Sequence, residues 1–99
     1  MQEQQLDELS GLILQTRDRQ ELEVLLQGLL TPQELDEVVL RWRLMALLLE
    51  GATQRDISHE LGISLGKIAR GSRLLKYGPP NFRELASRLL AEREAKPSV

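Results

Sequence analysis

The sequence predicts an all-α fold of six helices. Apolar residues recur at helical spacing along the chain, and the strict alternation of apolar and polar residues that indicates β-strands is absent. Asn-Gly and Asp-Gly pairs, which often form hairpin turns, are also absent. Residues that start and stop helices divide the pattern into six segments. Because 99 residues suffice for one domain and not two, we expect residues 1–99 to form a single domain.

The first helix is predicted over residues 4–16, and the second ends near residue 29. Asp18 is expected to cap the second helix, with Glu21 three residues later as its capping-box partner. Each helix carries an apolar face that we expect to be buried. The members of these faces are Leu6, Leu9, Leu12 and Ile13, followed by Leu22, Leu25, Leu26 and Leu29.

The third helix, residues 32–50, is the longest and begins at a complete start signal. Thr31 can cap the free N–H groups, Pro32 suits the first helical position, and Glu34 completes a capping box. The second half of this helix is apolar on nearly every side. This predicts a central helix surrounded by others from this chain or a second one. Gly51 is expected to end the helix.

A helix-turn-helix is predicted over residues 53–77, where two helices at 54–61 and 64–77 meet at a glycine. Gly62 opens the turn, because glycine adopts a positive φ at no steric cost. The residues expected to pack between the two helices are Ile57, Leu61, Ile63 and Ile68.

The last helix is predicted over residues 81–94, after the stop signal Gly78-Pro79-Pro80. We expect residues 95–99 to fray.

Positive charge is concentrated around the predicted helix-turn-helix. Residues 1–40 carry two basic and nine acidic side chains, whereas residues 41–76 carry seven basic and three acidic ones. Such a local excess is typical of a surface that binds phosphates, and a solvated basic face is the alternative.

A helix-turn-helix inserts the start of its second helix into the major groove. Arg55 can hold a guanine edge with two hydrogen bonds, and Lys67 can approach one as a point charge. Small side chains between them permit close approach, and residues at the helix starts can contact phosphates. The predicted DNA-binding residues are Gln54, Arg55, Ser58, Ser64, Leu65, Gly66, Lys67, Ala69, Arg73 and Lys76.

Several other classes of protein are disfavoured. The chain lacks cysteine and has His59 as its only histidine, which excludes a disulfide framework, a thiolate nucleophile and a His/Cys metal cluster. No glycine-rich phosphate loop or nucleophile motif is present, so we expect neither an enzyme nor a cofactor. The start of the chain does not read as a signal peptide, and its longest apolar run, residues 44–49, cannot span a membrane. We therefore expect a cytoplasmic protein.

Two segments resemble the bacterial tryptophan operon repressor family. One is Leu29-Leu30-Thr31-Pro32, at the start of the long helix. The other is Thr53-Gln54-Arg55-Asp56-Ile57, continued by Glu60-Leu61-Gly62 and Lys67-Ile68-Ala69-Arg70-Gly71-Ser72. The Arg-Gly-Ser triplet is the most specific element, and the resemblance extends over residues 25–90.

The resemblance implies an intertwined homodimer that binds operator DNA and takes a small aromatic amino acid as corepressor. Arg41 and Arg70 would sandwich the ring of this ligand, and Gly71 would leave room for it. Leu29, Leu30 and Thr31 would come from the other chain. The remaining implied ligand-binding residues are Met45, on the floor of the pocket, and Leu74.

The chain also departs from the family pattern. Leu74 stands where a serine hydroxyl often contacts the amino group of the ligand, so tyrosine is an alternative to tryptophan as the corepressor. Ala69, Arg73 and Lys67 replace other familiar residues on the DNA-facing side, which suggests a different operator sequence. For Arg41, the residues alone leave two partners open: an aromatic or anionic ligand, or an ion pair with Glu37 one turn away.

Three functions remain in competition. The first is a ligand-responsive repressor of an operon for amino-acid biosynthesis or transport. The second is a helix-turn-helix regulator without a ligand, in which Met45 and Leu74 fill the pocket. The third is a helical interaction module that does not bind DNA, which would suit the acidic first half of the chain.

Overall fold

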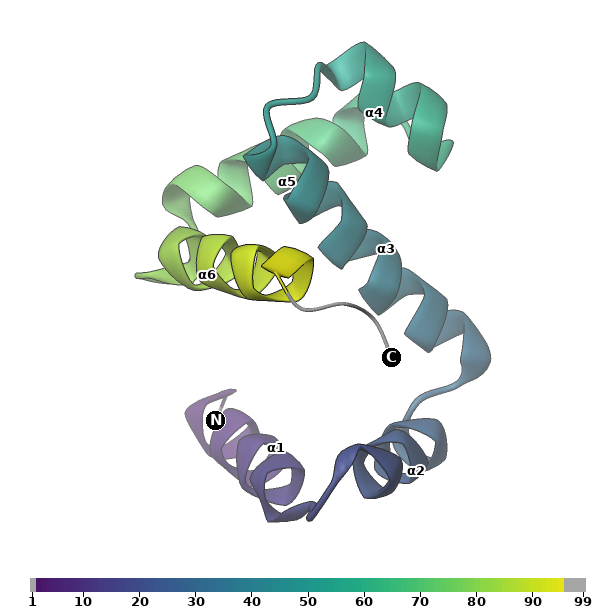
Figure 1. The fold of residues 1–99 in the computed structure, drawn as a ribbon, viewed down its shortest axis with the longest axis vertical. Coiled ribbons are helices and arrows are strands. Elements are labelled where there is room, and N and C mark those ends of the chain that lie inside the picture. Colours follow the sequence, from purple (N-terminus) through teal and green to yellow (C-terminus); the bar gives the residue numbers. More distant parts are fainter. Residues whose placement is uncertain (1, 96–99) are drawn as a thin grey trace. The chain divides into compact units, whose positions relative to one another are not determined.

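A computed structural model describes residues 2–95, which form six helices and no β-strand (Figure 1). This confirms the predicted fold class. The helices are α1 (Gln2–Gln15), α2 (Arg19–Leu29), α3 (Pro32–Leu49), α4 (Gln54–Leu61), α5 (Leu65–Tyr77) and α6 (Phe82–Ala95). The predicted frayed segment lies, from residue 96 on, outside the described residues.

The chain divides into two compact units, Met1–Glu37 and Val38–Val99, with the division inside α3. In the first unit, hydrogen bonds at the helix starts follow the predicted caps. The N–H of Glu21 donates to Asp18 Oδ1 at 2.9 Å, and Glu21 accepts from the N–H of Arg17 at 2.8 Å. The hydroxyl of Thr31 and the carboxylate of Glu34 each accept from the other residue's N–H, at 3.1 and 2.9 Å.

The expected burial of the apolar faces of α1 and α2 is not found within one chain. No side chain of residues 2–30 is buried, and Leu6 and Leu29 remain 64% and 54% exposed. In the apolar second half of the third helix Leu44 and Met45 are buried, whereas Val38 and Val39 of the first half are exposed. Burial of these apolar faces therefore remains a prediction.

The second unit contains a core. Leu44 of α3, Ile57 of α4 and Ile68 of α5 form one buried cluster. The partly buried residues packed against it are Leu47, Leu48, Ala52, Leu61 and Ile63. Helix α5 also contacts α6 (Figure 1), and Leu75 of α5 and Ala86 of α6 are buried.

Several helix boundaries differ from prediction by one or two residues, and α1 spans Gln2–Gln15 where residues 4–16 were predicted. The third helix ends at Leu49 instead of residue 50, and Gly51 follows with a φ of +86°. The last helix begins at Phe82, because Asn81 has a φ of +67° and stays outside it. Asparagine is one of the few L-residues that tolerate this left-handed conformation.

Candidate nucleic-acid interface

Helices α4 and α5 form the predicted helix-turn-helix. Ile57 and Ile68 are fully buried where the two helices meet, and Leu61 and Ile63 pack against them. The inward-facing positions are therefore those expected from the sequence. Burying an isoleucine side chain contributes about 1.5–3 kcal/mol, so these contacts hold the two helices in a fixed relation.

The turn between the helices is closed by two hydrogen bonds. Gly62 adopts φ 66° and ψ 34°, and its N–H donates to the carbonyl of Ser58 at 2.9 Å. The hydroxyl of Ser58 donates to the carbonyl of Ile63 at 2.8 Å. The positive φ explains the glycine, because a Cβ in this left-handed region is strained.

Helix α5 begins at a side-chain cap and presents its first turn to solvent. Ser64 Oγ accepts from the N–H of Lys67 at 3.2 Å. Leu65, Gly66 and Lys67 are exposed, whereas Ile68 is fully buried. A Cβ added at Gly66 would have Ser64 Oγ as its nearest neighbour, at 3.8 Å, so the backbone of this turn is open to an approaching molecule.

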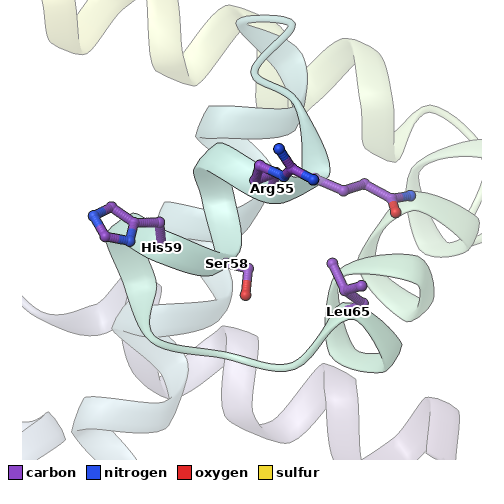
Figure 2. A pocket seen from close by; sticks show the side chains of 5 residues that line it. Arg55, Ser58, His59 and Leu65 are labelled. Atoms are coloured by element: carbon purple, nitrogen blue, oxygen red, sulfur yellow. The ribbon is translucent and has the colours of Figure 1, made fainter.

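An open concavity of about 500 Å³ lies between α4 and the start of α5 (Figure 2). Its lining consists of Gln54, Arg55, Ser58, His59 and Leu65. Figure 2 shows Ser58 between His59 and Leu65, with Arg55 above it. Although α4 also contains Asp56 and Glu60, neither carboxylate lines the concavity. The lining therefore offers hydrogen-bond donors and positive charge.

The structure brings four of the predicted DNA-binding residues together in this concavity: Gln54, Arg55, Ser58 and Leu65. The other six do not line it and are exposed at the start of α5 or further along the helix; they are Ser64, Gly66, Lys67, Ala69, Arg73 and Lys76. For Ser58, the hydrogen bond to Ile63 commits the hydroxyl proton, which leaves only its oxygen lone pairs for a ligand.

Sequence reasoning left His59 out of the predicted DNA-binding residues. The side chain is exposed, as expected for the outer face of α4, and it lines the concavity together with Arg55. The two residues are four positions apart, a spacing that makes side chains neighbours on a helix surface. This spacing was the signal available in the sequence.

Further along α5, Gly71 has a structural role of its own. A Cβ at this position would lie 2.7 Å from Leu44 Cδ2, 3.1 Å from Leu44 Cγ and 3.4 Å from Leu48 Cδ1. The missing side chain therefore lets α5 cross close to α3. Leucine side chains of α3 thus lie beside Gly71. The room for a ligand ring that the resemblance implied at Gly71 remains a prediction.

The other residues implied to bind a ligand are distributed over both units. In the second unit, Arg41 and Arg70 are exposed, Met45 is buried, and Leu74 is 43% exposed. In the first unit, Leu29 and Thr31 are exposed and Leu30 is half-buried. Leu74 Cδ1 would lie 2.8 Å from a Cβ at Gly78, so this leucine covers the end of α5.

The ion pair considered for Arg41 is not formed with Glu37. In residues 2–95, side-chain ion pairs join Arg19 to Glu23 and Arg88 to Glu92, and both pairs are exposed. The guanidinium groups of Arg41 and Arg70 take part in neither pair.

Acidic residues meet at one place in the second unit. A side-chain hydrogen bond with Glu94, together with partial desolvation and the charges of Glu94 and Glu60, raises the pKa of Glu50 above its ordinary value. The carboxylates therefore repel each other when all are ionised. Among the described residues there is no group of three or more His, Asp or Glu side chains suited to holding a metal ion. No helix within residues 2–95 has the length and apolar character to cross a bilayer.

Comparison with known proteins supports these observations. A sequence model of the family described as Trp repressor protein matches residues 4–90. A Trp operon repressor homolog from Pasteurella multocida is 41% identical over 69 residues, which covers 69% of this chain and 68% of that protein. One from Mannheimia succiniciproducens is 41% identical over 71 residues, covering 71% of this chain and 70% of the relative.

A shorter match joins the chain to a Trp operon repressor homolog from Chlamydia trachomatis. The two are 42% identical over 52 residues, and the match covers 52% of this chain and 55% of the relative.

Proposed function

The chain belongs to the Trp repressor family, and on this premise we propose that it represses an operon for amino-acid biosynthesis or transport, with an aromatic amino acid as corepressor. The family membership itself makes the chain a DNA-binding regulator of transcription and not an enzyme. It also removes the reason to favour an interaction module without DNA binding. A regulator of this kind acts on DNA in the cytoplasm, where we expect it to be found.

The observation that carries the proposal is the exposed first turn of α5 on a firmly packed helix pair. Ile68 anchors the turn from inside, while Gly66, Lys67 and Ala69 are left outward. Small side chains flanking a lysine allow the backbone to come close to base edges while the ammonium group meets phosphate or guanine. Arg55, in the adjoining concavity, would contact the same duplex. Arg73 and Lys76, also exposed on α5, would add phosphate contacts.

Operator DNA binding in this family goes together with dimerisation, and the first unit supports a dimer of this chain. Monomeric proteins rarely expose many large apolar side chains on consecutive helices. The exposed ones in α1 and α2 are Leu6, Leu9, Leu12, Leu14, Val24 and Leu29. A second copy that intertwines with the first would cover them and set the spacing of the two α5 helices for successive major grooves.

The proposed corepressor site uses Arg41 and Arg70 from one chain and Leu29, Leu30 and Thr31 from the other. Both guanidinium groups are exposed, so each is available to stack on a ring or to pair with a carboxylate. The Thr31 hydroxyl accepts the N–H of Glu34, and it still has a proton to donate. Because Leu74 offers no hydroxyl, the amino group of the ligand would bind backbone carbonyls. Tryptophan and tyrosine are the two candidates.

A thermal-shift screen of the common amino acids tests the ligand. A corepressor that binds only the folded protein raises Tm in step with its occupancy. We expect tryptophan or tyrosine to raise Tm and aliphatic amino acids not to. A variant Arg70→Ala should lose this shift while keeping its unliganded Tm.

If no aromatic amino acid raises Tm while the protein still binds its operator tightly, the regulator works without this ligand. One observation favours this second function: Met45 is buried and Leu74 carries no hydroxyl, so apolar side chains would occupy the pocket. Isothermal titration with tryptophan and tyrosine separates the two functions, because the second predicts no heat from either.

DNA binding itself is tested by the double variant Arg55→Ala, Lys67→Ala. Each phosphate contact that is lost reduces the slope of log K against log salt concentration by about 0.9. We expect the double variant to bind a duplex more weakly and with a shallower salt dependence. Unchanged affinity and slope would contradict the assigned surface.

A further inference from the structure

Resting on the proposed DNA-binding function, we propose that His59 is a phosphate-binding residue, and that the concavity between α4 and α5 receives a backbone phosphate of the duplex. The lining of this concavity combines the amide of Gln54, the guanidinium of Arg55 and the imidazole of His59. All three are exposed, and all three can donate hydrogen bonds. Phosphate oxygens accept hydrogen bonds, so a phosphate is complementary to these three donor side chains.

The short side chain of Ser58 leaves space in the lining of the concavity. Ser58 is short, and its hydroxyl is held by the carbonyl of Ile63 at 2.8 Å, so it does not extend toward the rim. Arg55 and His59 stand on either side of it along α4, one helical turn apart. A phosphate above Ser58 would therefore meet a permanent positive charge and a histidine together.

The position of His59 on its helix is compatible with a positive charge. It is the basic residue in the last turn of α4, near the negative end of the helix dipole. A protonated imidazole offers two N–H donors and a positive charge to a phosphate. The phosphate contact would therefore be stronger when the imidazole is protonated.

Besides His59, five charged groups belong to α4, to the first turn of α5 and to the segment after α3. Helix α4 contributes Arg55, Asp56 and Glu60. The first turn of α5, which packs on α4, contributes Lys67, and the segment after α3 contributes Glu50, whose pKa is raised partly by the charge of Glu60. Of these five groups, only Arg55 lines the concavity with His59. A phosphate bound there would meet no carboxylate in the lining.

The test compares the wild type with His59→Gln and His59→Lys. The probe is a fluorescein-labelled duplex of about 30 base pairs and mixed sequence, because phosphate contacts do not depend on sequence. Fluorescence anisotropy gives the dissociation constant over a series of KCl concentrations, at about pH 5.5 and at about pH 8. Circular dichroism verifies that each variant is folded, which is expected because His59 is exposed.

We expect the wild type to show a slope of log K against log salt that is steeper by about 0.9 at the acid pH than at the alkaline pH. His59→Gln should lose this difference, and His59→Lys should keep the steeper slope at both. Identical slopes for wild type and His59→Gln at both pH values would overturn the proposal while leaving the DNA-binding function intact. A wild type that does not bind the duplex would overturn both.

Discussion

The two units of this chain are stabilised in different ways. In Met1–Glu37, the helices start at well-formed side-chain caps, yet no side chain of residues 2–30 is buried. In Val38–Val99, the caps at Thr53 and Ser64 are accompanied by a core that contains the fully buried Ile57 and Ile68.

This difference indicates that the first unit depends on dimerisation for its stability, whereas the helix-turn-helix does not. Isolated helices shorter than about 12–15 residues are marginal in water, and α1 and α2 have 14 and 11 residues. Capping alone does not hold them, so they need a covering surface that a second copy would supply. The helix-turn-helix contains the packing that fixes its own shape, as a rigid reading head requires.

The largest expected effect lies in the core of the second unit. Ile68→Ala removes three carbon atoms from a fully buried side chain and should lower the free energy of unfolding by about 2–5 kcal/mol. Urea denaturation at fixed protein concentration measures it. Tyr77→Ala, at a side chain that is 82% exposed and lies outside the apolar faces of α1 and α2, is the control and should cost less than about 0.5 kcal/mol. A cost for Tyr77→Ala equal to that of Ile68→Ala would contradict burial as the cause of the larger effect.

A second test uses two glycines of α5. Gly71→Ala places a Cβ 2.7 Å from Leu44 Cδ2 and should destabilise by about 1–3 kcal/mol through overpacking. Gly66→Ala meets only Ser64 Oγ at 3.8 Å, and should stabilise by about 0.5–1 kcal/mol because alanine favours the helix. Opposite signs in urea denaturation are expected. A stabilising Gly71→Ala would show that α5 does not need its close approach to α3.

The first unit should respond to the loss of a cap. Thr31→Ala removes the acceptor for the N–H of Glu34 and should lower the free energy of unfolding by about 1 kcal/mol. Thr31→Ser keeps the hydroxyl and should retain most of the stability. The readout is the midpoint of urea denaturation followed by far-UV circular dichroism. Equal losses in both variants would assign the effect to the methyl group instead of the cap.

The smallest expected effect concerns Glu50 and depends on pH. Its pKa is raised by the hydrogen bond with Glu94, by partial desolvation and by the charges of Glu94 and Glu60. The folded state thus holds this proton more tightly than the unfolded state, whose carboxyl titrates near 4.5. The stability from the protonated form is present below that pH and is lost as the pH rises through the raised pKa.

Glu50→Gln should therefore raise Tm at neutral pH, because glutamine imitates the protonated carboxyl without its charge. The gain should shrink toward the pH at which Glu50 is protonated. Thermal unfolding at a series of pH values measures this, with Glu84→Gln, at an exposed position on α6, as the control. A gain that does not change with pH would remove carboxylate repulsion as its cause.

Much of the candidate site was predictable because its signals are local. Gly62 in the turn, the cap at Ser64 and the inward positions of Ile57 and Ile68 follow from spacing and residue type, and the structure has each as expected. The meeting of His59 with Leu65 in one concavity and the hydrogen bond from the Ser58 hydroxyl to Ile63 were not predicted. Both depend on which residues of α4 and α5 meet across the turn. The spacing of residues along a single helix does not reveal these contacts.

By itself, the sequence determined that the chain is helical, where each helix begins and ends to within about two residues, the usual uncertainty of such boundaries, and which stretch forms the helix-turn-helix. Only the tertiary structure decided that Gly71 serves the crossing of α5 over α3, and that the apolar faces of α1 and α2 stay uncovered in one chain. The physical reason is the distance along the sequence over which each kind of interaction acts. A cap or a turn is settled by atoms three or four residues apart, whereas packing depends on side chains that the sequence separates by dozens of positions.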